Sequence, residues 1–507
     1  MASAAMTEAD YADVQGLVRF GYGKMTRASY ALVRVKHASA ARTWLRSAPV
    51  TNAVATDPPP KTALNVAFTA PGLQALGVAE SIIATFSHEF RGGMAQESRS
   101  RQLGDVGNNA PSNWKWGNSG QEPHAVIMFF GEPESFDSFV RSSTSSSWAE
   151  GFGEPHWLET ENLDGVEPFG FTDGISQPQI DWQRRRDVTR PQLDYANIVA
   201  LGEFLLGYPN EYNKYTDRPL LDPDSSNSGL FAAEDYPEKK DLGRNGTYLV
   251  MRQLRQDVRA FWRFVYQQAG GNFGAADELA SAFIGRRRSG DPLMPIADKT
   301  IPGIGSDPKQ VRQNQFTFAQ DPVGARCPFG AHVRRANPRN SDYPGRPTGI
   351  AKLITMLGFG PKGFHDDLIS PVRLHRILRR GREYGPGLSP EDALTPEPPD
   401  DPERGLHFVC LNANILRQFE FLQNAWIAST KFSGMTEESD PLLGNREKIP
   451  GCQAAADFTK PTERGLRHRV FGLPQFVTVR GGAYFFLPSL RVLRYFAGFT
   501  GTAIART

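Results

Sequence analysis

Short apolar segments of strand length, each followed by residues at helical spacing, recur in both halves of this 507-residue chain. In the first half, residues 29–35 and 63–69 alternate apolar and polar side chains, with a short helical segment between them. A continuous apolar run at 124–130 has the length of a third strand, and another helical segment follows it. Strands of this length separated by helices predict an α+β layer, with helices on one face of an antiparallel sheet.

The second half repeats the pattern. The expected elements are a strand at 247–253, a helix with Leu254, Val258, Phe261, Trp262 and Val265 on its apolar face, a strand at 406–412, a helix capped by Asn414, and a hairpin at 476–488 that turns at Gly481 and Gly482. A turn-rich stretch at 208–229 joins the halves, and we place the boundary near residue 240. The sequence therefore predicts two similar α+β domains, at 1–240 and 241–507.

The composition excludes several classes of function. The chain has 57 basic and 55 acidic residues, so its net charge of +2 favours neither nucleic acid nor an acidic membrane surface as a partner. No apolar run approaches the length of a membrane span. Cys327, Cys410 and Cys452 are far apart, which argues against a disulfide framework or a zinc site. The first residues lack a secretory leader pattern, so we expect a cytoplasmic protein with reduced thiols.

A single carboxylate, Asp173, lies in the stretch GFTDGISQPQI, where Gly170 and Gly174 flank it. The two glycines leave little side-chain bulk, so the backbone there can approach a flat ligand closely. A simpler interpretation is that Asp173 caps a helix or closes an Asx-turn. The motif alone does not decide between a ligand site and a local turn.

A histidine followed by arginines forms a second candidate site, in RCPFGAHVRRANPR at 326–339. His332 is a candidate ligand, although most of the nine histidines in such a chain serve as ordinary hydrogen-bonded residues. Its neighbours Arg334, Arg335 and Arg339 form a cationic cluster that can hold the carboxylates of a bound cofactor. A third segment, LHRILRRGREYG at 374–385, reads by itself as a basic amphipathic stretch with a solvated face.

Taken in order, the segments GFTDG, CPFGAH with NPR, RILRRGREYG and RGGAYFFLP resemble those of the dye-decolorizing peroxidases. The resemblance extends from about Gly16 to about Leu493 and is greatest to the larger members of that family. It implies two ferredoxin-like domains, each a four-stranded antiparallel sheet with helices, of the dimeric α+β barrel type. It also implies haem b in the second domain, and the oxidation of bulky dyes and phenols by hydrogen peroxide through the oxidised state called Compound I.

The resemblance assigns roles on the two faces of the haem. On the distal face, Asp173 is the expected acid–base group and Arg379 the cation that assists it, with Arg380 as the alternative if the register shifts by one. On the proximal face, His332 is the expected iron ligand. Asp440 is expected to accept the other ring N–H of His332, which makes the imidazole a stronger donor. Glu437 and Glu438 are close enough in sequence to be alternatives to Asp440.

The remaining cofactor contacts follow from the same resemblance. Arg339 matches the arginine that binds a haem propionate, and Ile175 and Ser176 are expected beside the cofactor. Leu406 and Phe408 point the same way on a strand and should form a wall of the distal pocket, while His407 faces the other side.

The sequence departs from the compact relatives at Gly381, where they often carry asparagine. This removes one polar group from the distal site. Rival interpretations stay open: a protein that removes iron from haem, and a protein of another class, either a haem carrier or a haem-free ferredoxin-like oligomer. The expected partners are hydrogen peroxide and aromatic reducing substrates, and the sequence fixes neither the physiological substrate nor the oligomeric state.

Overall fold

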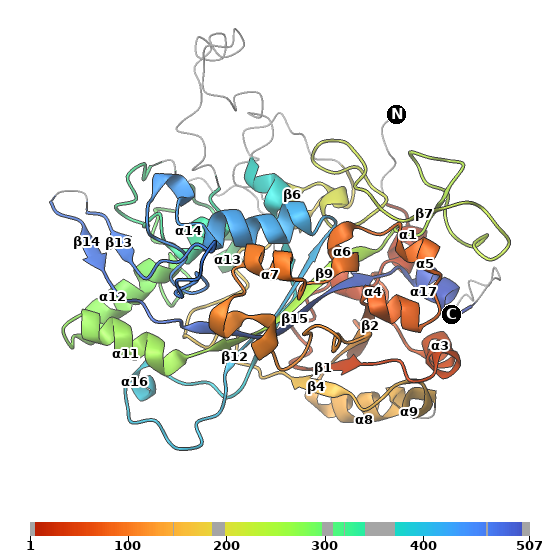
Figure 1. The fold of residues 1–507 in the computed structure, drawn as a ribbon, viewed down its shortest axis with the longest axis horizontal. Helices are drawn as coiled ribbons and strands as arrows, with labels where there is room; N and C mark the ends of the chain where they lie inside the picture. Colours follow the sequence, from red (N-terminus) through yellow and green to blue (C-terminus); the bar gives the residue numbers. More distant parts are fainter. Residues whose placement is uncertain are drawn as a thin grey trace, which may run out of the picture.

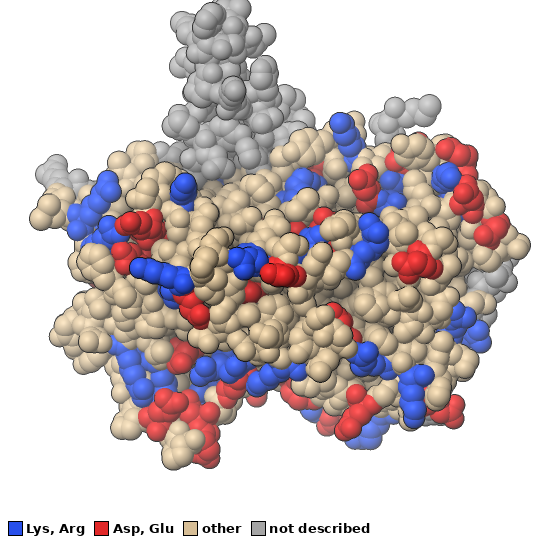
Figure 2. Space-filling model, viewed as in Figure 1, with Lys and Arg blue, Asp and Glu red and all other residues tan. Residues whose placement is uncertain are grey.

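A nine-stranded sheet runs through the described part of this computed structural model, and helices pack on it (Figure 1). The structure describes residues 6–144, 147–184, 198–296, 308–318, 320–339, 371–462 and 465–498. The strand order is β10–β12–β9–β15–β2–β3–β1–β4, with β11 paired to β12. Acidic and basic side chains are interspersed over most of the face in Figure 2, as the small net charge predicts.

The N-terminal half has the strand–helix–strand–strand–helix–strand order of a ferredoxin-like domain. Its elements are β1 (Arg27–Val33), α3 (Ala38–Ser47), β2 (Thr62–Phe68), β3 (Ala125–Gly131), α8 (Pro133–Ser143) and β4 (His156–Glu159). The neighbours in the order β2–β3–β1–β4 are all antiparallel. The three strands expected from the sequence are thus confirmed to within two residues.

The C-terminal half repeats this arrangement. Its elements are β9 (Thr247–Gln256), α11 (Val258–Gln268), α12 (Phe273–Ile284), β10 (Leu378–Arg379), β11 (Arg382–Tyr384), β12 (Gly405–Asn412) and β15 (Val477–Leu487). The two sheets join edge to edge through β15 and β2, where Phe486 is paired with Phe68. The expected α+β class with two ferredoxin-like sheets is confirmed, while the division near residue 240 stays a prediction.

Short elements complete the described fold. The helices are α1 (Glu8–Asp13), α2 (Gly16–Arg19), α4 (Ala70–Ala75), α5 (Glu80–Ile83), α6 (His88–Gly92), α7 (Glu97–Leu103), α9 (Ser147–Gly151), α13 (Pro308–Gln313), α14 (His332–Ala336), α16 (Pro390–Ala393) and α17 (Leu490–Phe496). The strand pairs are β5 (Gln179–Ile180) with β6 (Ile198–Val199), β7 (Leu220–Leu221) with β8 (Lys240–Asp241), and β13 (Phe458–Lys460) with β14 (His468–Val470). Among the described helices, none combines the length and apolar character that crossing a bilayer requires.

Burial on both faces explains why β3 reads as an unbroken apolar run. Ile127 and Phe129 belong to the hydrophobic cluster on one face of the sheet, and Met128 and Phe130 belong to the cluster on the other. A strand covered on both faces needs no alternation of polar side chains. The larger of the two clusters also contains buried residues of α11 and α12, so these helices cover the sheet of the C-terminal half.

The helix expected after Asn414 forms, but with the wider turns of a π-helix. The Asn414 side chain accepts a hydrogen bond of 2.8 Å from the Arg417 amide, as a capping residue should. The segments η6 (Leu416–Glu420) and η7 (Leu422–Ala428) are both π-helical. Their type could not be read from apolar spacing, because π-turns are rare and are set by packing rather than by propensity.

The hairpin expected at Gly481 and Gly482 is wrong, because β15 continues through both glycines with only a register shift after Val479. The glycines permit close packing instead of a turn. A Cβ on Gly481 would lie 2.5 Å from the indole of Trp116, and one on Gly482 would lie 2.6 Å from the Met94 sulfur. Leu254 was also placed wrongly, since it belongs to β9 and α11 begins only after its cap, Asp257.

Candidate functional site

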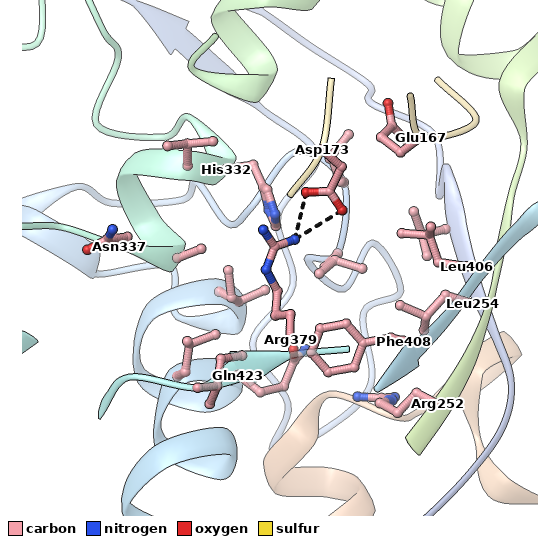
Figure 3. A pocket seen from close by; sticks show the side chains of 18 of the residues that line it. Glu167, Asp173, Arg252, Leu254, His332, Asn337, Arg379, Leu406, Phe408 and Gln423 are labelled. Atoms are coloured by element: carbon pink, nitrogen blue, oxygen red, sulfur yellow. Dashed lines mark hydrogen bonds and ion pairs between the residues drawn. The ribbon is translucent and has the colours of Figure 1, made fainter. Parts of the chain in front are cut away.

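A cavity lies between the sheet of the C-terminal half and the helical segments that cover it (Figure 3). Its apolar lining comes mainly from β9, β12, β15, α14 and the π-helical segments, and includes Leu254, Ile284, Val333, Leu406, Phe408, Phe419, Leu422, Ile427 and Val479. Leu406 pairs with Leu254 across the sheet and Phe408 with Arg252, so β9 and β12 present one continuous wall. His407 is buried outside the cavity lining, with Nε2 2.9 Å from the Glu159 carbonyl oxygen and its ring stacked on Tyr384.

Asp173 and Arg379 form an ion pair inside this cavity. The Arg379 Nη1 donates to both carboxylate oxygens of Asp173, at 2.8 and 3.1 Å. The two residues are 206 positions apart, and Asp173 lies in the segment before β9, so it enters the cavity from the N-terminal half of the chain. No helix begins within the described residues 174–184, so Asp173 does not serve as a helix cap.

The loop that carries Asp173 is held at several points. Its flanking glycines have positive φ, 95° at Gly170 and 77° at Gly174, a conformation that other residues rarely adopt. The Asp173 amide donates to the Gly165 carbonyl at 3.0 Å. Burial alone would raise the pKa of Asp173, but the charge and hydrogen bonds of Arg379 outweigh it and leave that pKa below its usual range. Asp173 is therefore an ionised carboxylate at neutral pH, in a fixed position.

Glu167 is a second carboxyl of the same loop that sequence reasoning missed. It lines the cavity and accepts hydrogen bonds from the amides of Phe169 and Phe171, both at 3.0 Å, and from Gln256 Nε2 at 2.7 Å. Burial, helped by the nearby charge of Asp173, outweighs these hydrogen bonds and raises the pKa of Glu167 to about 7. Its position six residues before Asp173 was the only available signal, and nothing in the sequence showed that it bonds across to β9.

His332 begins α14 and also lines the cavity. Its Nδ1 lies 2.9 Å from Oδ2 of Asp440, while Oδ1 of Asp440 accepts the amides of Leu442 and Leu443 at 2.9 Å each. Burial by itself would lower the pKa of His332, but Asp440 outweighs it, and the pKa is raised. With Nδ1–H bonded to a carboxylate, the lone pair of the neutral ring is on Nε2 and available to a metal.

The alternatives to Asp440 and Arg379 lie elsewhere. Glu437 is exposed and pairs with Arg469, while Glu438 accepts from the Thr459 amide through its side chain. Arg380 donates to the carbonyls of Leu17 and Val18, away from the ion pair. A Cβ at Gly381 would lie 2.4 Å from the His407 carbonyl oxygen, so close strand packing explains why this position carries no larger side chain.

The predicted arginine cluster is used mostly by the protein itself. Arg334 pairs with Asp321, and Arg335 donates to three carbonyls, those of Trp426, Ser429 and Glu438. Arg339 donates to the carbonyls of Asn314 and Phe316 and stacks on the Phe316 ring at 4.0 Å. Of the described residues that line the cavity, none belongs to this cluster, whereas Ile175 and Ser176 do line it.

The residues fit a flat metal-bearing cofactor. Within the described residues, no group of three or more His, Cys, Asp or Glu side chains is placed to hold a bare metal ion. One histidine with a free Nε2 in an apolar cavity instead suits a metal whose other ligands come from the cofactor. His332 and Arg379 both project into the space that such a group would occupy (Figure 3).

Known proteins with the same organisation were identified by sequence and by structure. Residues 31–147 match the family model described as the DyP dimeric alpha+beta barrel domain. The dye-decolorizing peroxidase msp1 of Mycetinis scorodonius is 30% identical over 466 residues, which cover 87% of this chain and 77% of that protein.

Solved structures agree over almost the whole chain. A decolorizing peroxidase from Auricularia auricula-judae superposes with a TM-score of 0.71 at 25% identity, over 96% of this chain and 100% of that one. A dye-decolorizing peroxidase in complex with 2,6-dimethoxyphenol superposes with a TM-score of 0.67 at 24% identity, over 96% of this chain and 99% of that one, and shows the shared fold.

Proposed function

This chain belongs to the dye-decolorizing peroxidase family, and from that premise we propose that it uses hydrogen peroxide at haem b to oxidise bulky dyes and phenols. It is an oxidoreductase of the peroxidase class. The observation that carries the proposal is one cavity lined by the Asp173–Arg379 pair and by His332, whose Nδ1 is bonded to the buried Asp440. Peroxide cleavage needs a proton shuttle with a cation on one side of an iron centre and a strong donor on the other.

When bound, haem b supplies the electrons that cleave the peroxide O–O bond, and a reducing substrate replaces them afterwards. Asp173 takes the proton from one of the two peroxide oxygens, the one that stays in the site. It delivers this proton to the other oxygen, which leaves as water. It can act first as a base because Arg379 keeps its pKa low. Arg379 stabilises the negative charge that develops on the leaving oxygen, a contribution of about 3 kcal/mol for one fixed donor.

On the other side, His332 would hold the iron through Nε2. Asp440 accepts the Nδ1–H bond and fixes both the ring orientation and the tautomer. Asp440 has no exposed surface, so water does not compete for this bond. Leu406 and Phe408 provide an apolar wall beside the distal pair and limit the water that reaches it.

The proposed reducing substrates are aromatic. Support comes from the family name of the relatives, which refers to dyes, and from the phenol found in one of the similar structures. Hydrogen peroxide is small enough to share the cavity with a cofactor, whereas bulky dyes are expected to react from outside it.

The test is spectroscopic. The purified full chain is loaded with haem b, one equivalent of hydrogen peroxide is added, and the Soret band is followed by stopped flow. A fast shift that a phenol or a dye then reverses is the expected result. A haem-bound protein with an unchanged spectrum would instead be a carrier, and the appearance of fluorescent iron-free porphyrin would indicate iron release. Absence of any Soret band after loading would reject every haem function.

A further inference from the structure

Glu167 closes the loop that leads to Asp173. Its Oε1 accepts a hydrogen bond from the Phe171 amide and its Oε2 accepts one from the Phe169 amide, both at 3.0 Å. The Glu167 amide donates to the Phe171 carbonyl at 2.9 Å, and the Gly170 amide donates to the Glu167 carbonyl at 2.7 Å. The loop is thus folded around one carboxyl, and Asp173 follows directly after it in the chain.

Other contacts fasten the loop to its surroundings without using a titratable group. Trp262 on α11 donates from Nε1 to the Phe169 carbonyl at 3.0 Å. The amide and the hydroxyl of Thr172 both donate to the Arg288 carbonyl, at 3.1 and 2.8 Å. Because neither bond involves an ionising side chain, both persist when the pH changes.

Gln256 on β9 makes the bond between Glu167 and the sheet sensitive to protonation. Gln256 Nε2 donates to Glu167 Oε2 at 2.7 Å, an arrangement that suits an ionised carboxylate. Gln256 Oε1 is buried and has no hydrogen-bond partner within the described residues. Rotation of the amide by half a turn would bring this oxygen to Glu167, where it can accept the O–H of a neutral carboxyl. The protonation state of Glu167 therefore decides which way the amide is turned.

Glu167 and Asp173 influence each other through their charges. Both line the cavity and are labelled in Figure 3. Burial is the main cause that raises the pKa of Glu167 to about 7, and the charge of Asp173 acts in the same direction. Repulsion between like charges is mutual, so an ionised Glu167 raises the pKa of Asp173 in turn. Asp173 stays ionised at neutral pH because Arg379 outweighs this effect.

The other charged groups beside the loop are already paired. The guanidinium of Arg288 lies over the Trp262 ring, 5.9 Å from its centre, and pairs with Asp277 at 3.7 Å. Arg404, whose carbonyl accepts a backbone amide of β9, pairs with Asp401 at 2.8 Å. The groups that β9 and α11 themselves present to the loop are a neutral amide and a neutral indole. Asp173 is therefore the charged neighbour through which Glu167 can act.

We propose that Glu167 is a positioning residue for Asp173, and that it gains or loses a proton near neutral pH while the Gln256 amide rotates to match. The inference rests on the proposed peroxidase function and adds a residue to that same site. When Glu167 releases its proton to solvent, a second negative charge appears near Asp173. The added charge makes Asp173 a stronger base toward peroxide.

The first test is infrared spectroscopy of the full-length protein, with and without haem. A carbonyl stretch of a protonated carboxyl should be present in the wild type, absent from Glu167→Gln, and lost as the pH rises through about 7. Gln256→Leu should shift this band, because the neutral carboxyl loses its acceptor. Glu161→Gln is the matched control, since Glu161 is an exposed acid shortly before the same loop, and it should keep the band unchanged. Absence of a titrating band, or an unshifted band in Gln256→Leu, would overturn the proposal.

The second test follows the reaction of the haem-loaded protein with peroxide by stopped flow. The wild-type rate should rise by roughly twofold to tenfold between about pH 6 and about pH 8, whereas Glu167→Gln should keep the lower rate throughout. A merely structural role would lower the rate of Glu167→Gln equally at every pH, and that result would overturn the proposal.

The two tests separate this inference from the peroxidase function. If Glu167→Gln folds poorly, the wild type still decides, because a rate that is flat over the same pH range would overturn the proposal. A protein that reacts with peroxide at no pH would reject the peroxidase function itself. The infrared titration of the haem-free protein does not depend on that function, so the absence of a titrating band would overturn the role of Glu167 separately.

Discussion

Replacement of Asp440 by asparagine should weaken haem binding and raise the reduction potential of the iron. The carboxylate accepts three hydrogen bonds at a site with no exposed surface, one from His332 and two from the amides of Leu442 and Leu443. Asparagine has one acceptor oxygen and one amino group in place of two acceptors. Either the two amides or His332 must therefore face an N–H donor.

Both orientations of the asparagine have a cost. If its oxygen keeps the two backbone amides, its amino group faces Nδ1 of His332 and shifts the ring proton to Nε2, where it blocks the iron. If the side chain turns round, two buried amide donors lose their acceptor, at about 1–3 kcal/mol for an unpaired buried group. The expected loss is thus roughly tenfold to a hundredfold in haem affinity, a range typical for the partner of a ligating histidine.

The assay is a Soret titration of wild-type and Asp440→Asn protein with haem, followed by redox titration of the loaded proteins. At saturating haem, the variant should show the higher potential, because its imidazole donates less charge to the iron. Glu437→Gln is a matched acid-to-amide control three residues away, on an exposed side chain paired with Arg469. Unchanged affinity and potential in Asp440→Asn, or equal changes in Glu437→Gln, would refute the reasoning.

Three further predictions concern the other groups of the cavity. His332→Ala should lose most of its haem, and added imidazole should restore part of it; full occupancy with an unaltered spectrum would identify another ligand. Arg379→Leu should slow the reaction with peroxide, measured by stopped flow, by roughly 10²- to 10³-fold. The loss of rate should become larger toward acidic pH, because without Arg379 burial raises the pKa of Asp173. A loss of rate that is constant with pH would contradict this. The folded-state pKa of Glu167 is raised from 4.5 to about 7. The contribution of the protonated carboxyl to the free energy of unfolding is therefore fully present below about pH 4.5 and is lost as the pH rises to about 7. Urea denaturation of the haem-free protein should therefore show the wild type losing up to about 3 kcal/mol of unfolding free energy relative to Glu167→Gln between these two pH values. A wild type that keeps or gains stability relative to the variant over this range would show that Glu167 is ionised throughout.

The sequence predicted the elements whose signals are local. The strands at 29–35, 63–69 and 124–130 were found because their apolar pattern reflects burial on one or both faces of the sheet. The cap at Asn414 was found because a capping side chain bonds within one turn. In contrast, Gly481 was mistaken for a turn residue, because the Trp116 ring that packs on it comes from the other half of the chain.

The site was predicted in part, through motifs rather than through geometry. Asp173 and Arg379 each lie in a recognisable segment, and the fold then brings them together across 206 residues. Glu167 and Arg286 were missed, since each is defined by what surrounds it in space. Glu167 bonds across to Gln256 on β9, and Arg286, which lines the cavity, has a guanidinium nitrogen for which the described residues provide no acceptor. A sequence pattern cannot show that a side chain lacks a hydrogen-bond partner.

The most direct test of the account compares haem-loaded wild type with Asp173→Asn after rapid mixing with one equivalent of hydrogen peroxide. Asparagine keeps the size of the side chain and an acceptor for Arg379 but cannot carry a proton. The account predicts that the Soret shift slows by about 100-fold or more, with haem content unchanged. A shift at the wild-type rate would contradict it and would leave Asp173 as a partner that only positions Arg379.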